Sequence, residues 1–126
     1  MIIGVPKEIK LQEHRIGLTP ESVETLTNKG HKVLVESNGG FEAGFTNENY
    51  EKAGAKIIDS AEEVYKSSEM VVKVKEPIPD EYKFLNSDLT LFTYLHQRYF
   101  VLKHRAQNLL FSLLNKALNL LDFRYF

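Results

Sequence analysis

Short apolar runs alternate with capped helical segments through the first 96 residues, and this alternation constrains the fold more than any other feature of the sequence. The expected strands are residues 2–5, 31–36, 57–58, 70–74 and 89–95. The expected helices start at Pro20 and end at Gly30, cover residues 47–53, run from a Ser60 cap to residue 67, and start again at Pro79. Strands that alternate with helices predict an α/β fold with a doubly wound, mostly parallel sheet covered on both faces.

Two of the helix starts carry strong capping signals. Thr19-Pro20-Glu21 supplies an N-cap, a proline at the first helical position and an acid in the first turn. Ser60 is followed three residues later by Glu63, which is the spacing of a capping box. These signals predict where the first and third helices begin.

The character of the sequence changes near His96, which divides it into a domain segment, residues 1–96, and a tail, residues 97–126. The first part carries 11 basic and 16 acidic side chains, whereas the tail carries five basic side chains and only Asp122. All seven Gly and all four Pro precede residue 80. One helical stripe of the tail holds Leu109, Leu110, Leu113, Leu114, Ala117, Leu118 and Leu121. We therefore expect a Leu-rich helical tail.

The overall composition excludes several classes of protein. The formal net charge is -1, so the sequence lacks the basic excess typical of nucleic-acid-binding proteins. It contains no cysteine, which excludes a disulfide scaffold, a cysteine nucleophile and a thiolate metal site. No stretch approaches the roughly 20 apolar residues of a membrane helix, and the amino end lacks a basic leader. We expect a cytoplasmic protein with neither nucleic acid nor membrane as partner.

Polar residues at the carboxyl ends of the expected strands indicate a candidate site, because ligands of parallel α/β sheets bind at that edge. Lys73 and Lys75 end one strand, two residues apart and so on one face of an extended chain, while His96 follows the next strand and Arg15 precedes the first helix. Arginine binds carboxylates through two parallel hydrogen bonds, lysine polarises carbonyls, and histidine exchanges protons near neutral pH. Each residue equally fits a solvated or structural role. The spacing of the histidines predicts no metal site.

Five collinear motifs add to this pattern. They are Gly4-Val5-Pro6-Lys7-Glu8; Arg15 with Thr19-Pro20, Val23 and Gly30; Gly44-Phe45 with Tyr50 and Ala53-Gly54-Ala55; Val72-Lys73-Val74-Lys75-Glu76-Pro77; and Leu91-Phe92-Thr93-Tyr94-Leu95-His96. Together they resemble the amino-terminal domain of the family of alanine dehydrogenase and the nicotinamide nucleotide transhydrogenase alpha subunit. Gln12 and Ile16-Gly17 depart from the family, which usually has Asn and Val-Ala there.

The resemblance implies a flavodoxin-like or Rossmann-like substrate domain and a role for each candidate residue. Arg15 would bind the carboxylate of pyruvate or L-alanine, Lys75 would bind the substrate and polarise its keto oxygen, and His96 would be the catalytic acid and base. The implied reaction is the NAD-dependent, reversible oxidative deamination of L-alanine to pyruvate and ammonium in alanine catabolism, by a homo-oligomer that is commonly a hexamer. The charges of Arg15 and Lys75 are expected to lower the pKa of His96.

Other features predict an incomplete protein. The sequence contains no Gly-rich turn of the kind that binds dinucleotides, so the NAD-binding domain is expected to be absent, the substrate domain incomplete and the isolated chain inactive. The tail is expected to be either a helix that covers the sheet or a foreign reading frame. One alternative is an amino-terminal fragment of a transhydrogenase alpha subunit, which does not need an oxo-acid site. Another is a non-catalytic remnant or interaction protein that acts through the Leu-rich tail.

Overall fold

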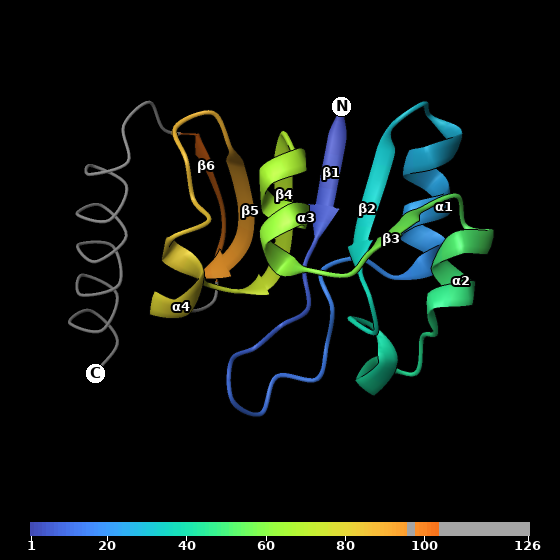
Figure 1. Ribbon diagram of the computed structural model, residues 1–126, viewed down its shortest axis with the longest axis horizontal. Helices are drawn as coiled ribbons and strands as arrows, with labels where there is room; N and C mark the ends of the chain where they lie inside the picture. Colours follow the sequence, from blue (N-terminus) through green and yellow to red (C-terminus); the bar gives the residue numbers. More distant parts are fainter. Residues whose placement is uncertain (96–97, 104–126) are drawn as a thin grey trace.

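A six-stranded sheet forms the centre of the computed structural model, which describes residues 1–95 and 98–103 (Figure 1). The strands are β1 (Ile2–Val5), β2 (Lys32–Glu36), β3 (Lys56–Ile58), β4 (Met70–Lys75), β5 (Thr90–Leu95) and β6 (Arg98–Lys103). Their order across the sheet is β3-β2-β1-β4-β5-β6, with β1 to β5 parallel and β6 antiparallel to β5. The predicted doubly wound, mostly parallel α/β fold is confirmed.

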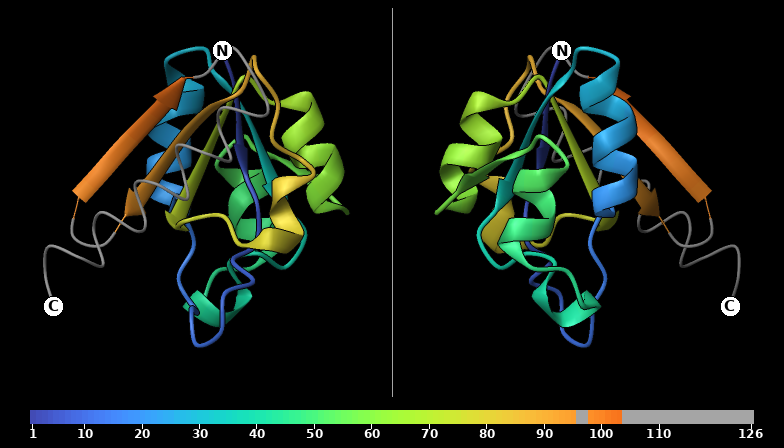
Figure 2. Two further views of the ribbon diagram at one scale, coloured as in Figure 1. Left: turned by 90° about the vertical axis from the view of Figure 1, so that its left-hand side faces the viewer. Right: turned by 90° about the vertical axis from the view of Figure 1, so that its right-hand side faces the viewer.

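Helices cover both faces of the sheet (Figure 2). They are α1 (Pro20–Asn28), α2 (Asn47–Lys52), α3 (Ala61–Ser67) and the short α4 (Pro79–Tyr82), with a 3-10 turn η1 (Phe41–Ala43). Val23 of α1 and Tyr50 of α2 share a core with Val72 of β4, whereas Tyr65 of α3 packs with Val71. Neighbouring residues of β4 therefore point to opposite sides, which we call the α1 face and the α3 face. No helix in the described part of the chain is long and apolar enough to cross a bilayer.

Local hydrogen bonds explain where the helices begin. The Thr19 hydroxyl accepts from the amide of Ser22 at 3.3 Å, directly before Pro20 at the start of α1. The Ser60 hydroxyl accepts from the amide of Glu63 at 3.2 Å at the start of α3. Such caps satisfy amides that the first turn of a helix leaves unpaired. Both helix starts agree with the sequence-based prediction.

Strand β1 and helix α3 approach each other closely at Gly4. A Cβ atom on Gly4 would lie 2.9 Å from Val64 Cγ1 and 3.0 Å from Ser68 Cβ, and closer still to Ser68 Oγ. Such distances are shorter than side-chain packing in a protein core tolerates. The bare backbone of β1 therefore lets α3 lie directly on the sheet.

The beginning of the tail forms a strand that the sequence analysis did not predict. Residues 98–103 form β6, which pairs with the outer edge of β5 from Thr90↔Lys103 to Leu95↔Arg98. An uncovered edge strand leaves a row of backbone donors and acceptors unpaired, and Tyr, Phe and Val in this segment favour a strand. The Leu-rich stripe from Leu109 to Leu121 lies outside the described residues.

Candidate functional site

The strand order places a crevice near the carboxyl ends of β1 and β4. Strand β1 lies between β2 and β4 in the sheet. The chain passes from β1 to β2 on one side and from β4 to β5 on the other, so the loops that follow β1 and β4 diverge here. A cavity of about 580 Å³ opens at this point on the α1 face. Its walls include Arg15, Gly17, Phe45, Val72 and Phe92. A mostly apolar wall with a cationic group at its margin suits a small organic anion.

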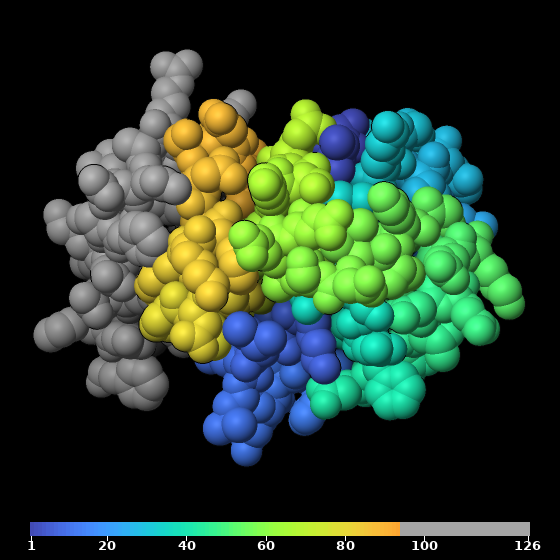
Figure 3. Space-filling view, in the orientation of Figure 1, coloured from blue at the N-terminus to red at the C-terminus, as the bar shows by residue number. Residues whose placement is uncertain are grey.

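The loop after β1, residues 6–19, forms one wall and projects from the carboxyl end of the sheet (Figure 3). A Cβ atom on Gly17 would lie 2.9 Å from the carbonyl carbon of Val72, so the loop backbone rests on the backbone of β4. The phenol of Tyr50 donates a hydrogen bond of 2.9 Å to the carbonyl of Leu18. Close backbone packing and a buried phenol thus hold the end of the loop against the sheet.

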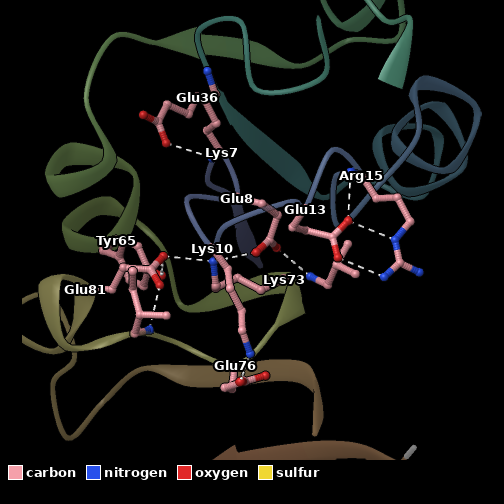
Figure 4. A network of polar contacts seen from close by, with 12 residues as sticks. Lys7, Glu8, Lys10, Glu13, Arg15, Glu36, Tyr65, Lys73, Glu76 and Glu81 are labelled. Atoms are coloured by element: carbon pink, nitrogen blue, oxygen red, sulfur yellow. Dashed lines mark hydrogen bonds and ion pairs between the residues drawn. The ribbon is translucent and has the colours of Figure 1, made fainter. Parts of the chain in front are cut away.

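Within this loop, Arg15 is held by a carboxylate two residues earlier (Figure 4). Arg15 Nε and Nη2 donate to the two oxygens of Glu13 at 2.9 and 2.8 Å, and the Arg15 amide donates to the same carboxylate at 2.9 Å. The side chain of Glu13 is 6% exposed and that of Arg15 is 67% exposed. The guanidinium is therefore oriented by a nearly buried partner while part of it stays accessible to solvent.

Glu13 is a residue of the candidate site that the sequence analysis missed. Its hydrogen bonds with Arg15 lower the pKa of Glu13 to about 2, and the charge of Lys75 contributes to the same shift. Arg15 and Lys75 thus both favour the charged form of one carboxylate, Arg15 through hydrogen bonds and Lys75 through its charge. The signal available in the sequence is a Glu two residues before an Arg, which is common in charged loops and therefore not diagnostic.

The two lysines of β4 do not share a face, contrary to the prediction from their spacing. The register between β4 and β5 runs from Val72↔Phe92 to Lys75↔Tyr94, so β4 has one residue more than β5 over this stretch. A β-bulge of this kind reverses the alternation of side chains beyond it. The register therefore returns Lys75 to the side of Val72, which is the α1 face. Val72 lines the cavity, whereas Lys75 is not part of the described cavity wall.

Lys73 points to the α3 face and is buried there. Its Nζ lies 3.0 Å from Glu8 Oε2 and 2.8 Å from Glu81 Oε1, and its side chain is 1% exposed. Tyr65 Oη donates to Glu81 Oε1 at 3.2 Å. Lys73 belongs to the cavity wall, but its ammonium group is enclosed by Glu8 and Glu81, so this group is no candidate for substrate contact.

The third predicted residue, His96, lies outside the described residues. It directly follows Leu95, the last residue of β5. Its role as the catalytic acid and base stays a prediction. Among the described residues, no three side chains of the metal-binding types come together.

The turn after β1 does not fit a dinucleotide. In dinucleotide-binding domains the first strand leads through a short Gly-rich turn to a helix N-terminus that receives the pyrophosphate. Here residues 6–19 separate β1 from α1. The first amides of α1 are also occupied, because Thr19 accepts from Ser22 and Val23. The described residues therefore offer no place for NAD at this position.

Together, the strand order and the crevice define a doubly wound α/β domain with a cationic site at the point where the strand order reverses. Comparisons with known proteins narrow this class. Residues 4–125 match the family described as alanine dehydrogenase/PNT, N-terminal domain. The alanine dehydrogenase of Bacillus subtilis is 56% identical over 96 residues, which cover 76% of this chain and 25% of that protein.

Solved structures agree with the sequence comparisons. An L-alanine dehydrogenase superposes with a TM-score of 0.74 at 55% identity, over 76% of this chain and 26% of the other. A transhydrogenase from Sinorhizobium meliloti superposes with a TM-score of 0.69 at 27% identity, over 75% of this chain and 28% of the other. The chain belongs to the alanine dehydrogenase/PNT family. It spans about a quarter of the length of the relatives that it matches.

Proposed function

We propose that this chain provides the substrate-binding part of an NAD-dependent alanine dehydrogenase. In the whole enzyme, L-alanine, NAD⁺ and water would give pyruvate, ammonium, NADH and a proton. Arg15 would bind the substrate carboxylate, Lys75 would polarise the keto oxygen, and His96 would exchange the proton. NAD itself would supply the hydride acceptor, and residues other than those described would hold it.

The single observation that carries this proposal is the pairing of Arg15 with Glu13 at the wall of the cavity. Arg15 already binds a carboxylate through two parallel hydrogen bonds, which is the geometry expected for the carboxylate of an oxo acid. The charge of Lys75 acts on the same carboxylate from the end of the neighbouring strand. Arg15 at the crevice would thus match the carboxylate of pyruvate, and Lys75 would match its keto oxygen.

The wall of the cavity offers apolar side chains that a small apolar substituent of the substrate could contact. Val72, Phe45 and Phe92 line it beside Arg15. Burial of a methyl group against such side chains is favourable by about 1 kcal/mol. The methyl group of pyruvate or L-alanine therefore has a suitable surface next to the site of its carboxylate.

A transhydrogenase alpha subunit is the second candidate, because one such structure has the same fold. The dehydrogenase is favoured for two reasons. The identity to the L-alanine dehydrogenase structure is 55%, against 27% for the transhydrogenase. A transhydrogenase also has no need of cations that recognise an oxo acid.

The proposal is tested by titrating the purified chain with pyruvate and, separately, with acetate, followed by NMR. Pyruvate should cause saturable shifts at Lys75 and His96, and Arg15→Ala should weaken binding at least about tenfold, since charge-assisted hydrogen bonds are lost. Lys66→Ala, an exposed cation on α3, is the matched control and should bind pyruvate as the unaltered chain does. Acetate lacks the keto oxygen and should bind more weakly.

The opposite results would refute separate parts of the proposal. Equal binding of acetate and pyruvate would exclude a role of Lys75 at the keto oxygen. No response to pyruvate in a chain with well-dispersed resonances would exclude the oxo-acid site. A pKa of His96 above that of free imidazole would argue against its role as a base beside two cations.

A further inference from the structure

Three charged side chains from distant parts of the chain meet in the interior on the α3 face. Glu8 comes from the loop after β1, Lys73 from β4 and Glu81 from α4 (Figure 4). The side chains of Glu8 and Lys73 are each 1% exposed, and that of Glu81 is 4% exposed. Burying charges costs free energy even when they are paired. A cluster of this kind therefore calls for a role beyond stability.

Glu8 makes two different contacts with β4. Its Oε2 lies 3.0 Å from Lys73 Nζ, and its Oε1 accepts from the backbone amide of Val74 at 2.6 Å. Both residues lie in the stretch where the register of β4 shifts. One carboxylate thus holds a side chain and a backbone amide of the bulge at the same time.

Glu81 secures the other side of the cluster. Its Oε1 lies 2.8 Å from Lys73 Nζ, and its Oε2 accepts from the amide of Ile78 at 2.9 Å, at the start of α4. Ion pairs with two carboxylates therefore hold the side chain of Lys73 on the α3 face. Beyond the bulge, Lys75 lies on the α1 face, where the cavity opens.

We propose that Glu8 is a positioning residue, which fixes the bulge of β4 through Lys73 and Val74 and so turns Lys75 toward the crevice. Without the bulge, the alternation of an extended strand would place Lys75 on the α3 face beside Lys73. Glu8 does not touch the crevice and acts only through β4. The expected effect on substrate binding rests on the proposed function of Lys75. The expected effect on the orientation of Lys75 is independent of that function.

The test compares two replacements of Glu8 in the full chain. Glu8→Gln keeps an oxygen that can accept from the Val74 amide, whereas Glu8→Met has similar length and no acceptor. Glu8→Met leaves Lys73 paired with Glu81, so no buried charge loses its last counterion. The three readouts are hydrogen exchange of the Val74 amide, NOE contacts of the Lys75 side chain, and the Kd of pyruvate.

In Glu8→Met, exchange of the Val74 amide should accelerate at least about tenfold and pyruvate should bind about tenfold more weakly. The NOE contacts between Lys75 and Tyr94, its partner in the register with the bulge, should be lost. Glu8→Gln should keep the NOE contacts of Lys75. Its exchange rate at the Val74 amide and its Kd for pyruvate should stay within about threefold of the unaltered chain, since the glutamine oxygen keeps the backbone hydrogen bond. A folded Glu8→Met chain that keeps the contacts between Lys75 and Tyr94 would overturn the proposal.

Two further results remain decisive. If Glu8→Met fails to fold, exchange in the unaltered chain decides: a Val74 amide as fast as exposed loop amides overturns the proposal, and a slow one supports it. If the unaltered chain does not bind pyruvate, the proposed function fails. The exchange and NOE comparison still decides the role of Glu8, because neither measurement uses substrate.

Discussion

Glu13 and Arg15 bind each other in the loop after β1 through two parallel hydrogen bonds of 2.8 and 2.9 Å. The acid comes first along the chain, its side chain lies against the protein, and the guanidinium extends toward the solvent and the cavity wall. Arg15 therefore has a defined direction without any ligand. Preorganisation of this kind reduces the entropy lost when a carboxylate binds.

The first prediction concerns the stability of this pair in acid. Arg15 lowers the pKa of Glu13 from 4.5 to about 2, so the pair stabilises the fold above pH 4.5 and loses this contribution as the pH falls toward 2. Because Arg15 is largely exposed, we expect about 1–2 kcal/mol rather than the full value of the shift. Glu13→Gln should lower the free energy of unfolding by this amount at pH 6 and by nearly nothing at pH 2.

Denaturant unfolding at a series of pH values measures this difference. Glu24→Gln, an exposed carboxylate on α1, serves as the control and should change stability little at either pH. A loss in Glu13→Gln that is equal at pH 2 and pH 6 would contradict the ionic origin of the effect.

The second prediction concerns Lys73. Lys73→Met leaves the carboxylates of Glu8 and Glu81 buried without their ammonium partner, which typically costs about 3–5 kcal/mol near neutral pH. Burial already raises the pKa of Glu8. A group with a raised pKa stabilises the fold below its unfolded value and loses that contribution as the pH rises. The deficit of Lys73→Met should therefore shrink when the pH is lowered from 7 to 4.5, as thermal unfolding would show.

Lys66→Met provides the matched control for that experiment. It removes the same charge from an exposed position on α3 and should alter stability by less than about 0.5 kcal/mol. If the loss of unfolding free energy in Lys73→Met grows as the pH falls, the loss does not come from unpaired, charged carboxylates of Glu8 and Glu81.

The third prediction concerns Tyr50, whose phenol ties α2 to the end of the loop after β1. Tyr50→Phe removes the 2.9 Å hydrogen bond to the carbonyl of Leu18 without changing the packed ring. A carbonyl left without its donor should cost about 1–2 kcal/mol in the free energy of unfolding, measured with urea. Since the loop carries Arg15, pyruvate should also bind more weakly. Unchanged stability would mean that water replaces the phenol at no cost.

The fourth prediction concerns the contact between β1 and α3. Gly4→Ala introduces a methyl group where Val64 and Ser68 already lie within 3.0 Å. Overpacking of this degree should destabilise the chain by about 1–3 kcal/mol. Ser68→Ala removes the nearest atom, so the double variant should lose less than the sum of the single variants. If the stability losses of the two single variants add in full in the double variant, as measured by thermal unfolding, residues 4 and 68 are not in close contact.

The sequence predicted most of the architecture because the relevant signals are local. The Thr19 and Ser60 caps act within three residues, and short apolar runs set the strands. The strand over residues 98–103 was not predicted, because it forms on the open edge of β5 and depends on that long-range pairing.

The candidate site was predicted only in part. The approach of Arg15 and Lys75 is expected from the rule that the carboxyl ends of parallel strands meet, and it stays a prediction. Glu13 escaped prediction because a charged residue in a loop gives no sign of whether its side chain will be buried. His96 stays a prediction, since it lies outside the described residues.

By itself, the sequence determined the order and type of the elements, because helix caps, glycine stops and apolar runs depend on neighbours along the chain. The tertiary structure alone decided that Lys73 is buried between two carboxylates and that a bulge separates it from Lys75. Glu8 and Lys73 are 65 positions apart, and the bulge that separates Lys73 from Lys75 depends on the register with β5. Side-chain direction in a strand is set by alternation until a long-range contact shifts the register, and such contacts exist only in the folded chain.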